Sequence, residues 1–496
     1  MAESADGSSA ARPASWRDVG AEAIMAEQCQ ARGRWGIVAA AAPVAARIAS
    51  ETLRAGGNAY DAAVAAALAE TVLLPPKCGL GGDLVAIVWE AGKAAPEALI
   101  AVGGAPAALA RATEAGRLSD TGPFAVGVPA APAGYAALAA RGRLSLDRLA
   151  GPAIALAERG FAWARICAVL SDESRALVLE HNPDGTRYYP GRAALRPGDT
   201  LRLPGMANML RLFAGAPAAF LAGPVGDAIV ARVAEAGGIL KKSDFAFARA
   251  EWSDVATLAH AETRLFATPA PTHGPSLLDA VARAGGTGQA EAYRAVLGAI
   301  AARRDRLADP SGTSMISAVD EEGTMVTIVH SNSYPRFGSG LIVGDYDLIL
   351  ANRAGRGFSA KPGHPNFPSA GRRPATTLHA WGARLPDGRR LLGATPGGTN
   401  QMPWNAATLA RLLAGEGDVG RLIVAPRWEW RPADDGVLVE EGFSAADIEA
   451  LDAAAPSFGT VERWAMRSAM QIMAVDADGG MAGAVDPRTV GGVFAL

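Results

Sequence analysis

The chain has 496 residues, half of them hydrophobic and a fifth of them charged, which is the composition of a folded globular protein. Its formal net charge of -3 leaves no basic surplus for binding nucleic acid or an anionic membrane surface. The first residues, "MAESADGSSAARPASWRDVG", lack the apolar core of a secretion signal, and no long apolar run follows. We therefore expect a cytoplasmic protein without a nucleic-acid or membrane partner.

Residues 1–34 are expected to be a disordered or peripheral segment, with disorder over about the first 15. A short apolar strand at 36–41 then leads into a helix at 43–54, which a Gly-Gly pair ends because glycine takes the left-handed conformation freely. The next helix runs from Asn58 or Ala59 to about Val72 and is so rich in Ala that it must pack closely. After a turn, residues 84–89 are typical of a buried strand.

The rest of the chain divides into a helical part and a strand-rich part. Amphipathic segments that end in Gly predict mostly helices from about 128 to 250. The polar segment 301–312 is expected to be an exposed connection. Beyond it, residues 314–330 and 339–350 alternate as strands do. A helix is predicted at about 405–413, and a final pair of strands at about 470–495. The clearest internal boundary therefore lies between Gly312 and Thr313.

The cysteines and histidines form no pattern typical of a metal site. Three Cys and six His are scattered along the chain, and no two His stand four residues apart. The Cys spacings fit neither a disulfide framework nor a zinc motif. We predict no metal and no organic cofactor.

Thr313 raises a question about nucleophilic catalysis. The sequence has no Gly-x-Ser-x-Gly elbow followed by an acid and a His, so an α/β-hydrolase triad finds no support. A hydroxyl nucleophile can also be activated when it belongs to an N-terminal Thr or Ser, whose own α-amine then serves as the base. An internal Thr gains that amine only when the chain is cut before it. A Gly-Thr pair alone is equally typical of an ordinary strand start.

Nine segments decide in favour of the nucleophile. They occur in this order: "LRAGGNAYDAAVAAAL", "CGLGGD", "TSMISAVDEEGTMVT", "FGSGLIV", "GFSAKPGHPN", "GRRPATT", "ATPGGTN", "APRW" and "DPRTVGG". From about residue 35 to the C-terminus the chain resembles the γ-glutamyltransferase family of N-terminal nucleophile hydrolases. The variants "NRAGRGFSAKPGHPN" and "VHSNSYPRFGSG" are similar to its acylase and amidase-like branch.

The resemblance implies a four-layer αββα sandwich, made as a precursor that cuts itself between Gly312 and Thr313. Cleavage would give a large fragment, 1–312, whose residues 35–312 are the large-subunit-like part, and a small fragment, 313–496. Together they would form one interleaved domain, and a homodimer of this pair is left open. Thr313 falls at the position of the nucleophile. Ser331 resembles the hydroxyl residue that bonds to it, although a strand-end Ser is an equal alternative.

Other site residues are carried over from the family's motifs. Gly397 and Gly398 match the paired glycines whose N–H groups can form an oxyanion hole. Thr376 and Thr377 stand where the family has two Ser residues beside the substrate. Asn332, in the segment typical of the amidase-like branch, is a further candidate for substrate binding.

The chain departs from the γ-glutamyl enzymes at both ends of their substrate clamp. Val102 or Gly103 stands where the family has the Arg that holds the substrate α-carboxylate. Gly357 replaces the Asp that takes the α-amine. Neither replacement can supply charge recognition, so glutathione is not the expected substrate.

Four arginines remain as candidates to meet a carboxylate on another acyl group, such as that of a dicarboxylic half-amide, or to be solvated loop residues. They are Arg353, Arg356, Arg372 and Arg373.

The sequence therefore predicts an amidohydrolase or acylase that cleaves a small-molecule amide through an acyl-enzyme on Thr313. One alternative is an acyltransferase, in which an amine intercepts the same intermediate. A second alternative is an uncleaved, non-catalytic relative that binds a ligand.

Overall fold

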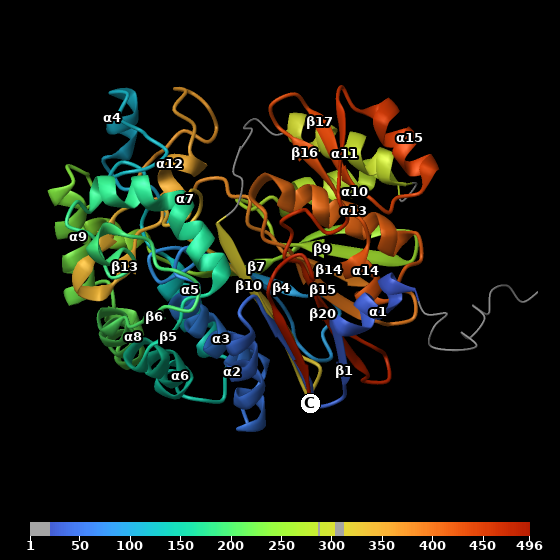
Figure 1. The fold of residues 1–496 in the computed structure, drawn as a ribbon, viewed down its shortest axis with the longest axis horizontal. Coiled ribbons are helices and arrows are strands. Elements are labelled where there is room, and N and C mark those ends of the chain that lie inside the picture. The colour runs from blue at the N-terminus through green and yellow to red at the C-terminus, as the bar shows by residue number, and fades with distance from the viewer. Residues whose placement is uncertain (1–19, 286–287, 303–311) are drawn as a thin grey trace, which may run out of the picture.

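The computed structural model describes residues 20–285, 288–302 and 312–496, and the chain is continuous from Gly312 to Thr313. Four layers succeed one another, with helices outside and two stacked sheets between them (Figure 1). This confirms the αββα sandwich. The disorder expected for the first 15 residues and most of the connection expected at 301–312 lie outside the described residues.

One of the two large sheets holds the predicted nucleophile. Its seven strands are all antiparallel to their neighbours. In spatial order they are β21 (Gly492–Ala495), β2 (Gly36–Ala40), β10 (Thr313–Asp320), β11 (Met325–Ser331), β3 (Asp83–Trp89), β4 (Glu97–Ala101) and β7 (Glu251–Asp254).

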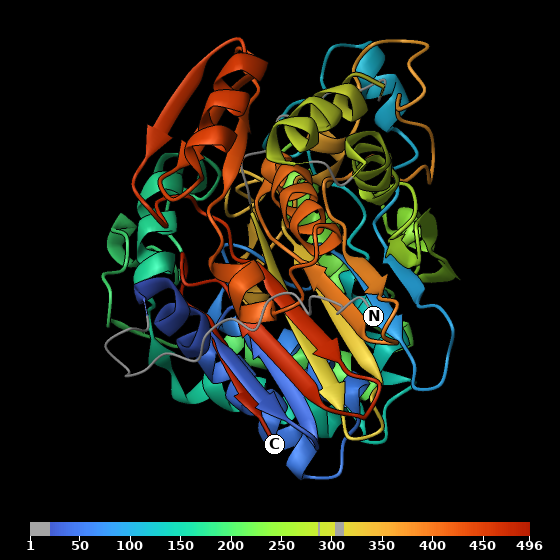
Figure 2. The ribbon, with the colours of Figure 1, turned by 90° about the vertical axis from the view of Figure 1, so that its right-hand side faces the viewer.

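The second large sheet also has seven antiparallel strands. Their order is β1 (Gln30–Gly33), β20 (Met481–Val485), β19 (Gln471–Val475), β15 (Arg390–Ala394), β14 (Trp381–Arg384), β9 (Thr263–Ala267) and β8 (Ala256–His260). In both sheets, strands from after Gly312 lie between strands from before it, so the two predicted fragments form one interleaved body (Figure 2).

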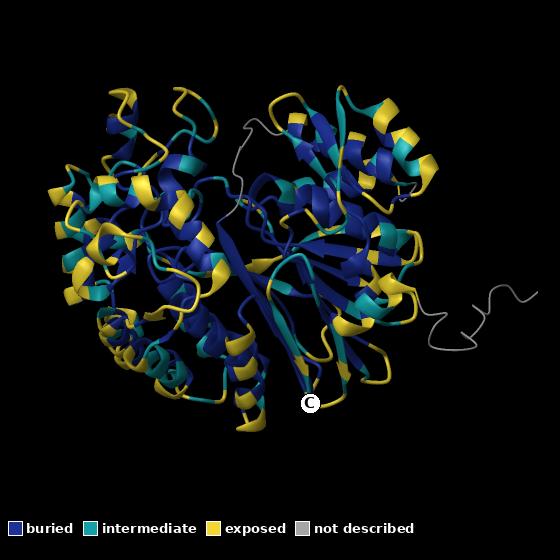
Figure 3. Cartoon of the chain, in the orientation of Figure 1, coloured by how far each residue is buried: buried dark blue, intermediate teal, exposed yellow. Residues whose placement is uncertain are grey.

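The side chains of the nucleophile sheet divide by strand alternation into two cores, since successive residues of a strand point to opposite faces. Val38 and Ile316 pack against the outer helices, whereas Ile37 and Met315 pack against the second sheet. Both faces are therefore covered, and the central strands are buried along their whole length (Figure 3).

Helices cover the outer faces of both sheets. The nucleophile sheet is covered by a group that includes α2 (Pro43–Arg54), α3 (Ala59–Leu73), α5 (Ala131–Ala139), α6 (Leu146–Arg159), α7 (Arg165–His181), α8 (Pro204–Gly215) and α9 (Pro224–Glu235). The second sheet is covered by α1 (Ala21–Gln28), α10 (Gly274–Ala284), α11 (Gln289–Ala302), α13 (Gln401–Leu413), α14 (Val419–Val424) and α15 (Ala445–Ala454). Two shorter helices, α4 (Leu109–Glu114) and α12 (Arg353–Gly357), share a small separate core.

Helix α3 shows why the Ala-rich stretch is helical and central. The Asn58 side chain accepts a hydrogen bond from the Asp61 N–H, and the Asp61 side chain accepts one from the Asn58 N–H, a reciprocal cap that satisfies free amide groups of the first turn. Every residue of the helix is buried. Its many small side chains let the helix lie closely against the nucleophile sheet, as the sequence predicts.

Three small sheets complete the fold. They are β5 (Phe161–Ala162) with β6 (Thr200–Leu201), β12 (Ile342–Val343) with β13 (Leu348–Ile349), and β16 (Trp428–Arg431) with β17 (Gly436–Glu440) and β18 (Phe458–Val461).

Residues 20–34 agree with the peripheral alternative, because α1 and the edge strand β1 lie there, with Ala26 buried. One sequence expectation needs correction. The expected strand at 339–350 is instead two short strands around a single turn of 3-10 helix at Gly344–Tyr346. Asp347, with φ 49°, adopts the left-handed conformation that ends this turn and breaks the strand.

One stretch, Pro217–Glu235, is long and apolar enough to cross a membrane when judged by length and composition alone. The structure divides it into a 3-10 turn at Pro217–Ala219 and the twelve-residue helix α9. A helix of twelve residues is about 18 Å long, well short of the roughly 30 Å of a bilayer core. The lack of a membrane partner stays a prediction.

Candidate active site

The predicted nucleophile lies at the end of a central strand of the buried sheet, in a row with the ends of two neighbouring strands. Thr313 is the first residue of β10 and pairs with Ser331, the last residue of β11. Ser331 in turn pairs with Asp83, the first residue of β3. All three side chains are buried. The register of the β10–β11 hairpin thus brings the two predicted hydroxyl residues together.

A line of hydrogen bonds connects the Thr313 hydroxyl to the peptide bond in front of it. The Thr313 Oγ1 donates to the Ser331 Oγ at 3.2 Å. The Ser331 Oγ donates to the Gly312 carbonyl oxygen at 2.6 Å and accepts from the Ser333 N–H at 2.8 Å. Ser331 therefore contacts both the attacking atom and the carbonyl of the predicted cleavage point.

Gly312 is required by the space around it. A Cβ atom at this position would lie 1.7 Å from the Ser333 carbonyl oxygen, and backbone atoms cannot move aside as a side chain can. Ser333 itself has φ 70°, an uncommon conformation for a residue with a side chain. This close approach fixes the Gly312 carbonyl against the Ser331 hydroxyl.

The predicted oxyanion glycines lie in the turn between β15 and α13. Gly397 has φ 152°, and a Cβ there would lie 2.3 Å from the Trp404 ring, so no other residue fits. The turn is placed near the nucleophile because β15 pairs through its last residue with Gln471, whose Nε2 donates to the Met315 carbonyl at 3.0 Å.

The two glycine amides differ in their surroundings. With the Gln401 amide oriented to satisfy its neighbours, its oxygen accepts from the Gly398 N–H at 3.2 Å and its nitrogen donates to the Thr377 carbonyl at 3.0 Å. The Gly397 N–H has no partner within the described part of the chain. Gly397 is therefore the more available donor of the pair.

The predicted substrate-binding threonines, Thr376 and Thr377, and Asn332 are all buried. The Thr376 Oγ1 accepts from the Leu378 N–H at 3.2 Å and is thus engaged by the backbone. The Thr377 hydroxyl has no hydrogen-bond partner among the described residues. Asn332 follows Ser331 directly; its Nδ2 donates to the Pro75 carbonyl at 3.1 Å, and its Oδ1 is buried without a partner.

Arg353 is separated from the other three candidate arginines by its burial. Its Nε donates to Asp83 Oδ2 at 2.6 Å, and both side chains are less than 5 % exposed, at 4 % and 2 %. Burial raises the pKa of Asp83, and Arg353 and the Gly103 N–H act against this. Sequence reasoning missed Asp83, although it stands within the quoted "CGLGGD" segment.

The remaining arginines are bound to surface groups. Arg356 pairs with Asp120 at 2.6 Å, and Arg373 pairs with Glu251 at 2.8 Å. Arg372 donates to a backbone carbonyl at 2.7 Å and is exposed. Of these three, Arg372 agrees with the alternative of a solvated loop arginine, whereas the side chains of Arg356 and Arg373 are only 17 % and 15 % exposed and Arg356 lies in α12.

A polar network that the sequence did not predict lies behind the nucleophile. The Glu70 carboxylate accepts from the Ser314 Oγ at 2.5 Å and lies 3.1 Å from the His330 Nε2, while the His330 Nδ1 lies 2.7 Å from the Tyr135 hydroxyl. Ser314 and His330 are direct neighbours of Thr313 and Ser331. No spacing signal could reveal this network, because Glu70 is 260 residues from His330.

Glu70 and His330, with Cys78, also form a group able to hold a metal ion, since their ligand atoms lie within 4.8 Å of one another. The Cys78 Sγ donates to the Glu70 carbonyl at 3.7 Å, and burial raises the pKa of this thiol well above its usual value. Each of the three side chains already has a hydrogen-bond partner in or beside the group, Cys78 with the Glu70 carbonyl, Glu70 with Ser314 and His330 with Tyr135. The residues present therefore favour a hydrogen-bonded network over a metal centre, and the lack of a metal stays a prediction.

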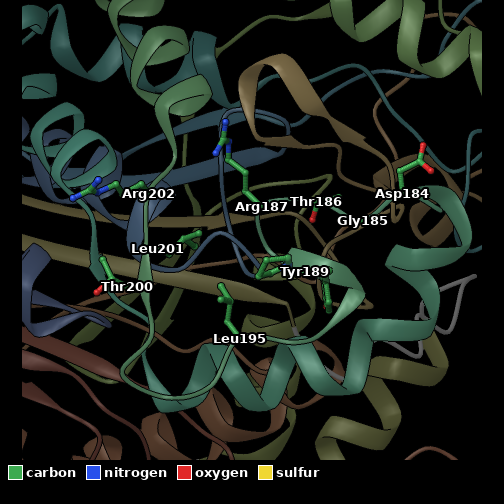
Figure 4. A pocket seen from close by; sticks show the side chains of 11 residues that line it. Asp184, Gly185, Thr186, Arg187, Tyr189, Leu195, Thr200, Leu201 and Arg202 are labelled. Atoms are coloured by element: carbon green, nitrogen blue, oxygen red, sulfur yellow. The ribbon is translucent and has the colours of Figure 1, made fainter.

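Two hollows differ in their relation to these residues. One of about 840 Å³ is lined by residues 184–202, and none of the predicted site residues lines it (Figure 4). The other, of about 640 Å³, includes Gly397, Trp404, Tyr334 and Trp430 in its wall. Tyr334 comes three residues after Ser331, so this second hollow adjoins the candidate active site. It reaches the surface, because Arg467 in its wall has a side chain that is 75 % exposed.

Stacked antiparallel sheets between helices, with a buried Thr opening a central strand beside a second hydroxyl, define an N-terminal nucleophile hydrolase. The family model described as gamma-glutamyltranspeptidase matches residues 45–294 and 279–496. The chain belongs to this family, and it is an amide hydrolase or acyltransferase.

Similar proteins agree with this assignment. The glutathione hydrolase proenzyme of Escherichia coli is 25 % identical over 92 % of this chain and 91 % of its own length. The oxamate amidohydrolase proenzyme of Klebsiella pneumoniae is 27 % identical over 84 % of this chain and 90 % of its own. The crystal structure of cephalosporin acylase from Bacillus halodurans has a TM-score of 0.83 and 28 % identity, and covers 94 % of this chain and 97 % of its own.

Proposed function

We propose that the protein is a self-cleaving amidohydrolase in which Thr313, once freed at its amine, cleaves an amide other than a γ-glutamyl amide. The hydrogen-bond line from Thr313 through Ser331 to the Gly312 carbonyl carries the proposal. It aligns a nucleophile, a proton path and an electrophile in one buried place. Relatives named as proenzymes support the same reading.

In the self-cleavage step the Thr313 Oγ1 attacks the Gly312 carbonyl carbon. Its proton passes to the Ser331 Oγ, and the Ser331 proton passes to the carbonyl oxygen, so no charge is left on either hydroxyl. The hydroxyl of this tetrahedral intermediate then loses its proton as the C=O bond reforms, and the Thr313 nitrogen gains one as the carbon–nitrogen bond breaks, which leaves an ester on Thr313 and a free amine. Water hydrolyses the ester to a Gly312 carboxylate and the Thr313 hydroxyl.

The freed amine then serves as the base for the amide substrate. An α-amine has a pKa near 8, so roughly a tenth of it is unprotonated at pH 7 and the share grows as the pH rises. Thr313 Oγ1 would attack the substrate carbonyl, and the Gly397 N–H would stabilise the oxyanion. The departing amine takes a proton from the Thr313 ammonium, and water releases the acyl group.

At the two positions where the γ-glutamyl enzymes carry their charged clamp residues, this chain has no room for a larger side chain. This supports a substrate outside the γ-glutamyl class. A Cβ at Gly103 would lie 1.6 Å from the Val128 carbonyl oxygen, and one at Gly357 would lie 2.6 Å from the Pro374 Cβ. Val102, the other position considered, is buried between the sheets. No arginine or aspartate side chain can project from Gly103 or Gly357 as the backbone stands.

Acyl transfer to an amine remains a second candidate, because it shares every step up to the acyl-enzyme. Family membership favours either enzyme over a non-catalytic ligand-binding protein. A cytoplasmic location and a homodimer of the paired fragments stay predictions.

The test has two parts. The intact mass of the purified protein should show two fragments divided at Gly312–Thr313, whereas a Thr313→Ala variant should remain one chain. Small amides should then release amine with the wild-type protein only, and an added amine acceptor separates transfer from hydrolysis through the products. A wild-type chain that stays whole after long incubation and releases no amine would contradict the proposal.

A further inference from the structure

Self-cleavage would turn Thr313 from an internal residue into the end of a chain. Before the cut, the peptide bond ties Thr313 to Gly312, which is itself fixed because its carbonyl oxygen accepts from the Ser331 Oγ at 2.6 Å. The cut removes this support. Chain ends fray unless other contacts hold them, and a displacement of about 1 Å can lower the rate of a positioned nucleophile by roughly 100-fold. The active form therefore needs another way to hold the start of β10.

The backbone holds these first residues from one side. β10 pairs with β11 from Thr313 onward, whereas its pairing with β2 begins at Ile316, opposite Ala40, the last residue of β2. Within the described chain, residues 313–315 thus have a neighbouring strand on one side only. A strand end with half of its ladder depends more on its side chains to stay in place.

The Glu70 carboxylate connects the start of β10 to the chain that leaves β2. Its Oε2 accepts from the Ser314 Oγ at 2.5 Å, and its Oε1 accepts from the Ala42 N–H at 3.1 Å. Ala42 comes two residues after the end of β2. The carboxylate thus makes its contacts just beyond the point where the backbone ladder between β2 and β10 ends.

The same carboxylate also contacts β11. The Glu70 Oε2 lies 3.1 Å from the His330 Nε2, and His330 is paired with Ser314 in the hairpin. These two residues are the direct neighbours of the two hydroxyl residues of the site. All three side chains are buried, and Glu70 belongs to the last turn of the wholly buried helix α3. One side chain therefore ties both strand ends to the helix layer.

Glu70 acts from the opposite face of the sheet. Successive side chains of a strand point to opposite faces, so Ser314 and His330 point away from the face that holds the Thr313 and Ser331 hydroxyls. The carboxylate lies on that opposite face, away from the substrate, and its influence on the reaction passes through the position of Thr313.

We infer that Glu70 is a positioning residue that holds the new N-terminus in place after self-cleavage, through Ser314. This inference rests on the proposed self-cleaving function and adds the contact that keeps Thr313 aligned for turnover. The competing explanation is a buried polar network that stabilises the fold equally before and after the cut.

Hydrogen–deuterium exchange at residues 313–316, read by mass spectrometry, separates the two explanations. Ser314→Ala removes one hydroxyl and leaves the other contacts of Glu70 in place. In the cut protein it should speed exchange at the start of β10 by at least about 10-fold, the usual worth of a hydrogen bond to a charged group. In the uncut Thr313→Ala background the same change should alter exchange by less than about 3-fold, because Gly312 still holds the strand.

Two more variants define the effect. Glu70→Gln places an amide NH₂ among groups that donate hydrogen bonds, so it should act in the same direction as Ser314→Ala. Ser317→Ala removes a hydroxyl from the same strand, one that contacts Thr327 at 3.1 Å and not Glu70, and is the matched control. It should leave exchange at residues 313–316 unchanged in both the cut and the uncut protein.

Reaction rates supply a second readout. Ser314→Ala and Glu70→Gln should still cleave themselves within about 3-fold of the wild-type rate in the intact-mass assay, because the uncut chain holds Thr313. Hydrolysis of the N-acyl p-nitroanilide that the wild-type protein cleaves fastest should then lose at least about 10-fold in kcat with little change in KM, because the carboxylate does not touch the substrate.

Equal acceleration of exchange in the cut and the uncut protein, no acceleration in the cut one, or an unchanged kcat in the folded variants would overturn the inference. A wild-type protein that is cut but releases no p-nitroaniline counts against amide hydrolysis alone, and the exchange data then decide the inference by themselves. A wild-type chain that stays whole would contradict the proposed function and the inference together, since no new N-terminus would exist.

Discussion

Replacing Ser331 by Ala tests the hydrogen-bond line on which self-cleavage depends. The change removes the hydroxyl that donates to the Gly312 carbonyl at 2.6 Å and accepts from Thr313 at 3.2 Å. Loss of a single donor to a developing oxyanion costs about 2.7–4 kcal/mol, or roughly 10²–10³-fold in rate. The proton path from Thr313 is lost as well, so we expect cleavage to slow by at least about 100-fold.

The assay follows the intact mass of freshly made protein over time after cell-free synthesis. Ser317→Ala is the matched control, because it removes a hydroxyl from the same hairpin, where Ser317 contacts Thr327 at 3.1 Å and not the scissile bond. That variant should be cleaved at nearly the wild-type rate. Ser331→Thr, which retains a hydroxyl on the same Cβ, should restore much of the lost rate.

Cleavage of a folded Ser331→Ala variant within about 3-fold of the wild-type rate would refute the reasoning, since the magnitude expected from one oxyanion donor is far larger. Circular dichroism of each variant ensures that a slow rate does not arise from misfolding.

Three further predictions concern strain, pH and burial, with stability measured by denaturant unfolding in the single-chain Thr313→Ala background. Gly312→Ala should slow cleavage by about 100-fold in the intact-mass assay, because its Cβ would lie 1.7 Å from a backbone oxygen and shift the scissile carbonyl by about 1 Å; a normal rate would contradict this. Burial raises the pKa of Asp347 from 3.8 to about 6, so between these pH values the folded protein holds a proton that the unfolded chain has lost. This proton contributes about 3 kcal/mol to the free energy of unfolding at low pH, and the contribution is lost as the pH rises from 3.8 to 6. Asp347→Asn should therefore be more stable relative to wild type at pH 7.5 than at pH 4.5, and a pH-independent difference would show that reasoning to be wrong. Asp486→Ala should lower the free energy of unfolding by about 3–5 kcal/mol, because Arg427 then stays buried without its carboxylate; a loss below about 1 kcal/mol would refute it.

Local signals predicted the elements whose ends are marked by the chain itself. The helix at 43–54 begins with Pro and ends before a Gly-Gly pair, and the structure has the same bounds. The expected helix at 405–413 begins earlier, at Gln401, because the turn that contains Gly397 feeds directly into it. Its first residues have no capping side chain, so the sequence gives no sign of where the helix starts.

The candidate site likewise contains contacts that could be predicted from the sequence and contacts that could not. Thr313 and Ser331 were paired by the resemblance to the family, and in the structure the register of the β10–β11 hairpin brings them together. Arg353 and Asp83 are 270 residues apart, and Glu70 and His330 are 260 apart. Such contacts depend on how whole layers stack, which residue spacing cannot encode, so the sequence left four arginines as equal candidates.

The interleaving of strands has a consequence for how the protein could be made. In the nucleophile sheet, β10 and β11 lie between β2 and β3, so two antiparallel ladders hold the part after Gly312 inside the part before it. As one chain, the two parts meet at the high effective concentration that a covalent link provides. If the two parts were synthesised as separate chains, they would have to associate while each exposed the strands that are buried in the complete sheet. The proposed cut at Gly312 would therefore suit a late event, after the uncut peptide bond has helped the two parts to assemble.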